Sequence, residues 1–208
     1  MPENKNDSTP SSFAVELLHR IWTTKGARFN AHRRFRTQGQ LSIHTISWLS
    51  AYVFVATLAT IYPGLNLSEA HSHLITFITS ALAVLILVLS VLEGGKEYAL
   101  KSERLHQCAI QLSGLYDEIK QWVENSTSLD TDHVFLAEAA KKYEDILMRT
   151  SENHETIDYD YFLSQYPKEF GISHVQTIWI KFLWFLKVYG FHRLLVWSPP
   201  ILIVIYIL

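Results

Sequence analysis

The chain is short of charge in one long stretch and of cysteine throughout, and each shortage excludes a class of protein. Between Thr37 and Leu92 only Glu69 is charged. The overall charged fraction of 18% predicts about ten charges in those 56 residues. One cysteine excludes an internal disulfide framework. The other 152 residues carry 37 charges, which is the density of a soluble protein. The sequence therefore combines a nearly uncharged stretch with regions of ordinary soluble composition.

Motifs of known catalytic chemistry are also lacking. The sequence contains no HExxH pair, no glycine-rich phosphate loop and no G-x-S-x-G turn. Cys108 falls on an apolar helical face and is expected in the core rather than as a nucleophile. We therefore expect no enzyme, with no catalytic, cofactor-binding or metal-binding residues. His154 and Asp158 have the i, i+4 spacing of a metal pair if helical, but helix capping at a bend is the favoured interpretation.

Two long uncharged segments account for the shortage of charge. Leu41–Tyr62 has 22 residues, Leu74–Leu92 has 19, and neither contains Asp, Glu, Lys or Arg. A bilayer core of ~30 Å needs ~20 helical residues at ~1.5 Å each. We therefore expect two transmembrane helices joined by a turn that begins at Pro63 and Gly64. The alternative is a buried helix pair in a soluble bundle, which would normally keep one polar face.

Positive residues predict the orientation of this transmembrane hairpin. The loop 63–73 has no Lys or Arg, whereas both outer flanks are basic. Because the side richer in Lys and Arg is cytoplasmic, we expect a multi-pass inner-membrane protein with a cytoplasmic N-terminus. The flanking basic residues are Arg20, Lys25, Arg28, Arg33, Arg34 and Arg36 before the first span, and Lys96, Lys101 and Arg104 after the second.

Hydroxyl side chains recur at helical spacing along both spans. They allow either close packing within the hairpin or, once several hairpins assemble, a polar stripe that lines a pore. One hairpin cannot enclose a channel, so conduction would require a homo-oligomer. The residues of this hydroxyl stripe are Ser47, Ser50 and Thr57 in the first span and Thr76, Thr79 and Ser80 in the second.

The region before the first span divides into a flexible N-terminus, 1–12, and a basic amphipathic helix, 13–40. Phe13, Leu17 and Ile21 recur every four residues and predict the apolar face of that helix. Its later half, 27–36, interleaves basic and aromatic residues. This pattern is compatible with nucleic acid, but topology and attraction to anionic lipid are the favoured explanation.

The region 93–170 is predicted to form a cytoplasmic helical domain. We expect helices from Glu93 to about Glu124, on to about Arg149 after a polar loop, and from Thr156 to Gln165. Residues 105–170 contain 13 acidic and 5 basic residues, a net charge of −8. This charge disfavours direct nucleic-acid binding and suits a basic protein partner. The side chains expected inside are Leu105, Cys108, Leu112, Leu115, Ile119, Trp122, Val134, Tyr143, Ile146 and Leu147.

The C-terminal segment 178–208 is apolar and aromatic again. Trp179, Trp184 and Trp197 favour a membrane interface. Only 15 residues follow Arg193, which is ~22 Å of helix and short of a full span. We expect an interfacial helix followed by a further membrane segment, for which full crossing and a re-entrant dip both remain open. Pro199 and Pro200 either start a final short helix or kink a longer one.

Two short sequence motifs resemble those of a known family. KKYEDIL, residues 141–147, and ENHETIDYDY, residues 152–161, resemble the Tyr-x-x-Ile-Leu, Glu-Asn-His and Asp-Tyr pattern of one subgroup of the SLATT family, which are prokaryotic two-transmembrane effectors. The resemblance covers the chain from about Phe13 onwards. Its motif residues here are Tyr143, Glu152, Asn153, His154, Asp158 and Tyr159.

The resemblance implies an all-α membrane protein that acts as an effector of an antiviral defence system. Its implied action is to oligomerise and to form a pore or disrupt the inner membrane, which stops growth of the infected cell. The implied partners are the lipid bilayer, further copies of the chain, and a cytosolic protein such as a second-messenger synthase or a reverse transcriptase. The family has no catalytic motif. A membrane-anchored scaffold that recruits a cytosolic defence enzyme is the alternative function.

Overall fold

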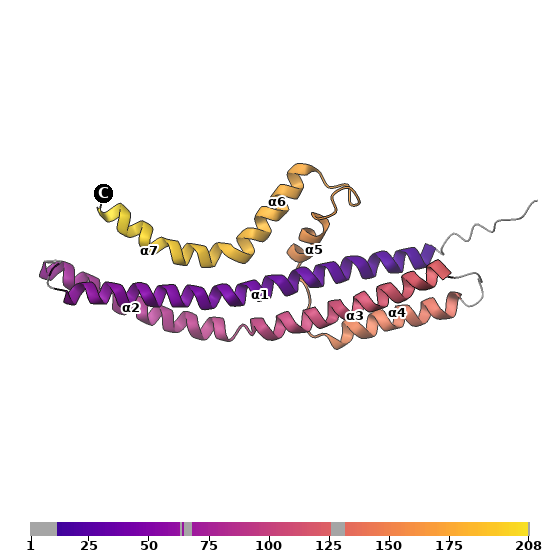
Figure 1. Cartoon of the computed structure of the whole chain (residues 1–208), viewed down its shortest axis with the longest axis horizontal. Coiled ribbons are helices and arrows are strands. Elements are labelled where there is room, and N and C mark those ends of the chain that lie inside the picture. Colours follow the sequence, from indigo (N-terminus) through magenta and orange to yellow (C-terminus); the bar gives the residue numbers. More distant parts are fainter. Residues whose placement is uncertain (1–11, 63, 65–67, 126–131, 208) are drawn as a thin grey trace, which may run out of the picture. The chain divides into compact units, whose positions relative to one another are not determined.

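The computed structural model describes residues 12–62, 64, 68–125 and 132–207 (Figure 1). Nearly all of the predicted N-terminus 1–12, Pro63 and most of the loop 125–132 lie outside this part of the chain. The described part is helical and contains no strand, which confirms the all-α prediction. Its helices are α1 (Ser12–Ile61), α2 (Glu69–Gly94), α3 (Tyr98–Asn125), α4 (Asp132–Arg149), α5 (Thr156–Leu163), α6 (His174–Phe185), the π-helical turn η2 (Leu186–Gly190) and α7 (Phe191–Ile207).

The chain divides into two compact units. The first, here called the helical unit, comprises the residues up to Arg33 and Leu100–Lys181. The second, here called the apolar unit, comprises Arg34–Ala99 and the residues from Phe182 onwards.

Helix α1 is a single helix of 50 residues. It contains both the predicted basic helix 13–40 and the predicted first span 41–62, without a break between them. No proline interrupts this stretch, and its backbone hydrogen bonds therefore continue across the change from basic to apolar sequence. The predicted helix that continues from Glu93 is instead interrupted after Gly94, and α3 begins at Tyr98.

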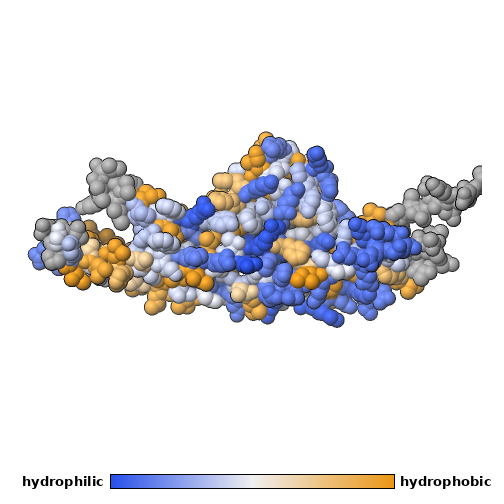
Figure 2. All heavy atoms as spheres, in the orientation of Figure 1, coloured by the Kyte–Doolittle hydropathy of each residue, from blue (hydrophilic) through white to orange (hydrophobic). Residues whose placement is uncertain are grey.

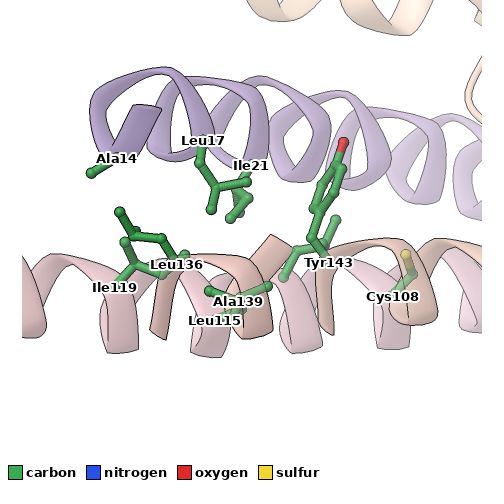
Figure 3. Packing of buried hydrophobic residues seen from close by; sticks show 10 residues of the cluster. Ala14, Leu17, Ile21, Cys108, Leu115, Ile119, Leu136, Ala139 and Tyr143 are labelled. Atoms are coloured by element: carbon green, nitrogen blue, oxygen red, sulfur yellow. The ribbon is translucent and has the colours of Figure 1, made fainter. Parts of the chain in front are cut away.

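The core of the helical unit lies between the start of α1, α3 and α4 (Figure 3). Leu17 and Ile21 of α1 face the other two helices, and Tyr143 of α4 extends its ring toward α1. The predicted apolar face of α3 is buried there, including Cys108 at 1% exposure. Val134 is 72% exposed, so its predicted inward position is wrong. The α4 face that packs is formed by Leu136, Ala139 and Tyr143.

Helix α5 and the turn after it pack around Trp22 of α1. The Trp22 ring lies 5.0 Å from the rings of Phe162 and Tyr166, both edge-on, and is stacked with Phe170 at 5.6 Å. Aromatic pairs at such separations contribute about 0.5–1.5 kcal/mol each beyond their buried area. The aromatic residues of this short segment therefore attach it to α1.

The apolar unit leaves large apolar side chains uncovered. Phe54 is 64% exposed, Ile61 71%, Phe77 73% and Leu87 65%. Figure 2 shows hydrophobic residues gathered over α2 and the end of α1, and hydrophilic residues over α3 and α4. In the described residues two stretches are long and apolar enough to cross a membrane, and their apolar windows are only 17% and 6% buried. Core helices of a soluble bundle would be mostly buried, so this exposure argues against that alternative.

Polar side chains link α1 to η2 and α7 within the apolar unit. Thr45 Oγ1 on α1 lies 3.2 Å from Nδ1 of His192 on α7, and both residues are buried. Gln38 donates to the backbone carbonyl of Lys187 in η2 at 3.1 Å. Helix α7 has 17 residues and contains Pro199 and Pro200 within it, so the prolines do not start a separate helix. The turn η2 runs into α7 without a break, so residues 186–207 together reach the ~20 residues that a span needs.

Candidate functional site

The Glu-Asn-His segment, residues 152–154, links α4 to α5 and is bound to α1. Arg28 of α1, only 4% exposed, donates from Nη1 to the backbone carbonyl of Glu152. Arg104 of α3 pairs with the Glu152 side chain at 3.3 Å. Glu152 thus receives one arginine on its backbone and another on its carboxylate, from two different helices.

Asp158 fixes the start of α5. It is fully buried, and its carboxylate accepts the backbone N–H of Glu155 at 3.0 Å within a capping box. Its own backbone carbonyl accepts a hydrogen bond from Asn30 Nδ2 on α1 at 3.1 Å. The interpretation of this cluster as helix capping at a bend is confirmed.

His154 lies before α5 rather than on it, so the helical pairing with Asp158 that a metal site would use is not formed. Within the described part of the chain, no three His, Cys, Asp or Glu side chains are grouped as metal ligands. His154 is half-buried, and its Nδ1 atom has no hydrogen-bond partner. Burial lowers the pKa of His154, the positive charge of Arg28 lowers it further, and Asp158 acts in the opposite direction.

The remaining motif residues have local roles. The Tyr143 hydroxyl lies 2.9 Å from Oγ1 of Thr24, and the guanidinium of Arg20 lies 5.0 Å from the centre of the Tyr143 ring. Asn153 is exposed and accepts the backbone N–H of His154 on its side-chain oxygen at 2.9 Å. Tyr159 is half-buried. The contacts of Tyr143 attach α4 to α1.

Two of the basic residues assigned to lipid and topology are buried. Arg28 is 4% exposed and Arg34 is 1% exposed. A buried guanidinium does not meet a lipid headgroup, so lipid contact is not their role in this structure, whereas their predicted contribution to topology stays a prediction. Sequence reasoning also missed Asn30 and Gly26, although both are poor helix formers inside a long helix, which is a signal that they serve a neighbour.

The structure separates the six hydroxyls of the stripe. Thr79 is buried, and the others are exposed. At ~100° per residue, Ser47, Ser50 and Thr57 lie within roughly 80° of one another on α1, and Thr76 and Ser80 lie within roughly 40° on α2. Every hydroxyl of the stripe donates to a backbone carbonyl three or four residues earlier in its own helix. These donors are therefore satisfied before any partner binds.

Two hydroxyls outside the stripe contact another helix of the apolar unit. Thr45 contacts His192, and Ser42 lies near the buried carboxylate of Glu93 at the end of α2. Glu93 also accepts from Lys96 at 2.5 Å and from the Tyr98 hydroxyl at 3.0 Å. Sequence reasoning missed this polar group because Ser42 and Thr45 are uncharged residues at the edge of an apolar run.

Comparison with known proteins covers almost the whole chain. Residues 10–206 match the model of a protein family described as SMODS and SLOG-associating 2TM effector domain family 5. No curated protein and no solved structure matches the chain significantly.

Proposed function

The chain belongs to the SMODS and SLOG-associating 2TM effector (SLATT) family, and from this premise we propose how it acts as a membrane effector of a prokaryotic conflict system. The proposal is that several copies assemble through the apolar unit in the inner membrane. The assembly opens a pore or disrupts the bilayer, and the loss of the membrane barrier stops growth of the infected cell.

The observation that carries this proposal is the uncovered apolar surface of α1 and α2. Exposed side chains such as Phe54, Ile61, Phe77 and Val91 form far more apolar surface than a soluble monomer tolerates. Lipid or further copies of the chain must cover them. Membrane insertion covers these side chains with lipid, and assembly covers them with further copies of the chain.

Pore formation is supported by where the exposed hydroxyls lie. Thr76 and Ser80 share one face of α2 with Val84 and Leu87, and this face is exposed in a single copy. Their oxygens remain available as acceptors, because each hydroxyl hydrogen is donated to the helix backbone. This face of α2 can contact lipid in the resting protein and water in an assembled pore.

The helical unit is proposed to be cytoplasmic, as the basic flanks of the hairpin predict. It acts without catalysis, through contact with a cytosolic protein partner such as a second-messenger synthase or a reverse transcriptase. Its acidic surface suits a basic partner. For partner binding to open the hairpins, the partner must bind the open arrangement more tightly than the closed one.

Membrane potential in expressing cells tests the proposal. Induction of the wild-type chain, together with its activating partner where one is required, is expected to depolarise the membrane and admit a small impermeant dye. A Thr57→Val, Thr76→Val, Ser80→Ala triple variant is expected to reduce dye entry strongly. Ser113→Ala removes an equivalent backbone-bonded hydroxyl from α3 and is expected to change nothing.

The scaffold alternative is favoured by one observation, since all six stripe hydroxyls are satisfied within their own helices and require no pore. It predicts that unrelated apolar helices in place of 41–62 and 74–92 preserve growth arrest. Growth arrest with an intact membrane potential would refute the pore and support the scaffold.

A further inference from the structure

A cleft of about 450 Å³ opens in the helical unit between α1, α3 and α5. Flat rings form much of its wall, with Trp22 and Phe29 from α1, Phe162 from α5 and Tyr166 just after α5. Small-molecule sites are concave, mostly apolar and ~300–1,000 Å³ in volume, with a few polar groups. The cleft therefore has the size and the lining of such a site.

The lining of the cleft is basic, whereas the later part of the helical unit is acidic. Its lining includes Lys25 and Arg33 and no Asp or Glu, although residues 105–170 carry a net charge of −8. In the part of the chain that the structure describes, neither cation has a carboxylate within salt-bridge distance. Lys25 Nζ lies 3.9 Å from the centre of the Tyr116 ring, and Arg33 donates to Asn30 Oδ1 at 2.7 Å. Asp117 attracts Lys25 electrostatically, but neither cation has a carboxylate as a direct partner, and a concave site with such cations attracts anions.

A pair of histidines completes the polar side of the cleft. The rings of His32 and His106 are stacked, with centroids 4.5 Å apart. The Nδ1 atom of His32 lies 3.0 Å from the backbone carbonyl of Ser102. The Nδ1 atom of His106 is buried and has no partner. Because buried polar atoms are nearly always hydrogen-bonded, this atom indicates that the site is incomplete as it stands.

We infer that this cleft binds a small anion with a flat ring system, of the nucleotide class. The ring lies against the aromatic wall formed by Trp22 and Phe29, where base–aromatic stacking contributes ~1–3 kcal/mol. The phosphate lies beside Lys25 and Arg33, which supply charge-assisted hydrogen bonds. A long nucleic-acid strand is disfavoured, because residues 105–170, which form the α3 and α5 sides of the cleft, carry a net charge of −8 that repels a polyphosphate backbone.

Fluorescence anisotropy on the purified full-length protein in detergent tests this inference, with a fluorescent N-methylanthraniloyl derivative of ATP as the probe. We expect saturable binding that unlabelled ATP displaces and that equal concentrations of inorganic phosphate or adenosine displace far less well. Arg33→Ala is expected to weaken binding about tenfold, which is ~1.4 kcal/mol. Arg36→Ala is the matched control, since Arg36 is an exposed arginine on the same helix outside the cleft, and it is expected to leave the affinity unchanged.

Phe29→Leu is a second variant that keeps an apolar side chain but removes the ring, and it is also expected to weaken binding. Circular dichroism of each variant checks that the helices remain. Absence of saturable binding at millimolar probe would overturn the inference. Equal losses in Arg33→Ala and Arg36→Ala, or displacement by single-stranded RNA at lower concentration than by ATP, would overturn it as well. Because the readout is binding alone, its failure is distinct from failure of the proposed membrane activity.

Discussion

Gly26 allows α5 to lie against α1. A Cβ atom added at this position would overlap the buried ring of Phe162. Gly114 on α3 is the natural comparison, because a Cβ atom there meets nothing within 4 Å. The two glycines therefore separate the effect of helix propensity from the effect of close packing.

Gly26→Ala is expected to lower the free energy of unfolding of the helical unit by about 1–3 kcal/mol, the usual range for overpacking. Gly114→Ala is expected to raise it by up to ~1 kcal/mol, because alanine is the better helix former. Chemical denaturation followed by circular dichroism measures both. Equal stabilisation by the two substitutions would show that Phe162 does not pack against Gly26.

His154 makes the docking of the motif segment sensitive to acid. Burial and Arg28 lower its pKa in the folded chain, so the unfolded chain, with a pKa of ~6.5, takes up the proton first. The stability that the neutral imidazole contributes is complete above pH ~6.5 and is lost as the pH falls toward the lower folded pKa.

Hydrogen exchange of the backbone amides around 150–158 is expected to speed up when the pH falls below ~6.5, after correction for the intrinsic rate. His154→Gln stays neutral at every pH and is expected to remove that part of the pH dependence. An identical pH dependence in the wild-type chain and in His154→Gln would contradict this role.

At the residue scale, periodicity and composition predict the residues whose role depends on their near neighbours in the sequence. The apolar face of α3 was predicted because its residues recur at three- and four-residue steps, and the capping role of Asp158 follows from its place before an apolar turn. Asn30, Arg28 and the unpaired His106 could not be predicted, because their importance arises from residues more than 70 positions away that pack against them only after folding. Val134 was placed inside for a related reason, since periodicity alone did not show which face of α4 meets α3.

At the scale of elements, the junction between α2 and α3 is strained at one residue. Glu97 has a φ of 51°, in the left-handed region, whereas Gly95 before it is in the right-handed helical region. A residue with a Cβ atom in the left-handed region costs about 1–2 kcal/mol relative to its normal conformation. The tight connection is kept because Glu93 binds both Lys96 and Tyr98 across it.

Glu97→Gly is therefore expected to raise the thermal unfolding temperature of the detergent-solubilised protein slightly. Glu97→Val is expected to lower it by more, because a β-branched side chain tolerates this conformation poorly. Equal unfolding temperatures for the two variants would indicate that the junction does not hold the left-handed conformation. Lys101→Ala on α3 serves as a control for the loss of a nearby surface charge.

The sequence predicted most of the helices but not where one helix continues into the next and where it breaks. The change from basic to apolar sequence near residue 40 suggested two helices, yet nothing in that stretch stops helical hydrogen bonding, and α1 runs through it. The break after Gly94 falls inside the helix predicted from Glu93, and its left-handed residue could not be predicted, because glutamate rarely adopts that conformation. The prolines of α7 remain inside a helix, which sequence rules leave open near a chain end.

At the scale of the whole molecule, the two units differ in what surrounds them. The helical unit buries its apolar residues among its own helices, and the apolar unit leaves them uncovered. The near-neutral net charge of −2 is likewise a sum of unlike parts, because the acidic residues of 105–170 are offset by the basic residues of 20–36. The proposed membrane activity rests on the apolar unit crossing the bilayer with the helical unit on the cytoplasmic side.

Labelling of single cysteines tests that arrangement most directly. In a Cys108→Ala background, His73→Cys places a thiol near the tip of the hairpin and Val134→Cys places one on exposed α4. A maleimide reagent that cannot cross membranes is expected to label the His73→Cys variant in intact spheroplasts. It is expected to label the Val134→Cys variant only after the membrane is opened. Equal labelling of both variants in intact spheroplasts, or recovery of the protein in the soluble fraction, would contradict the account.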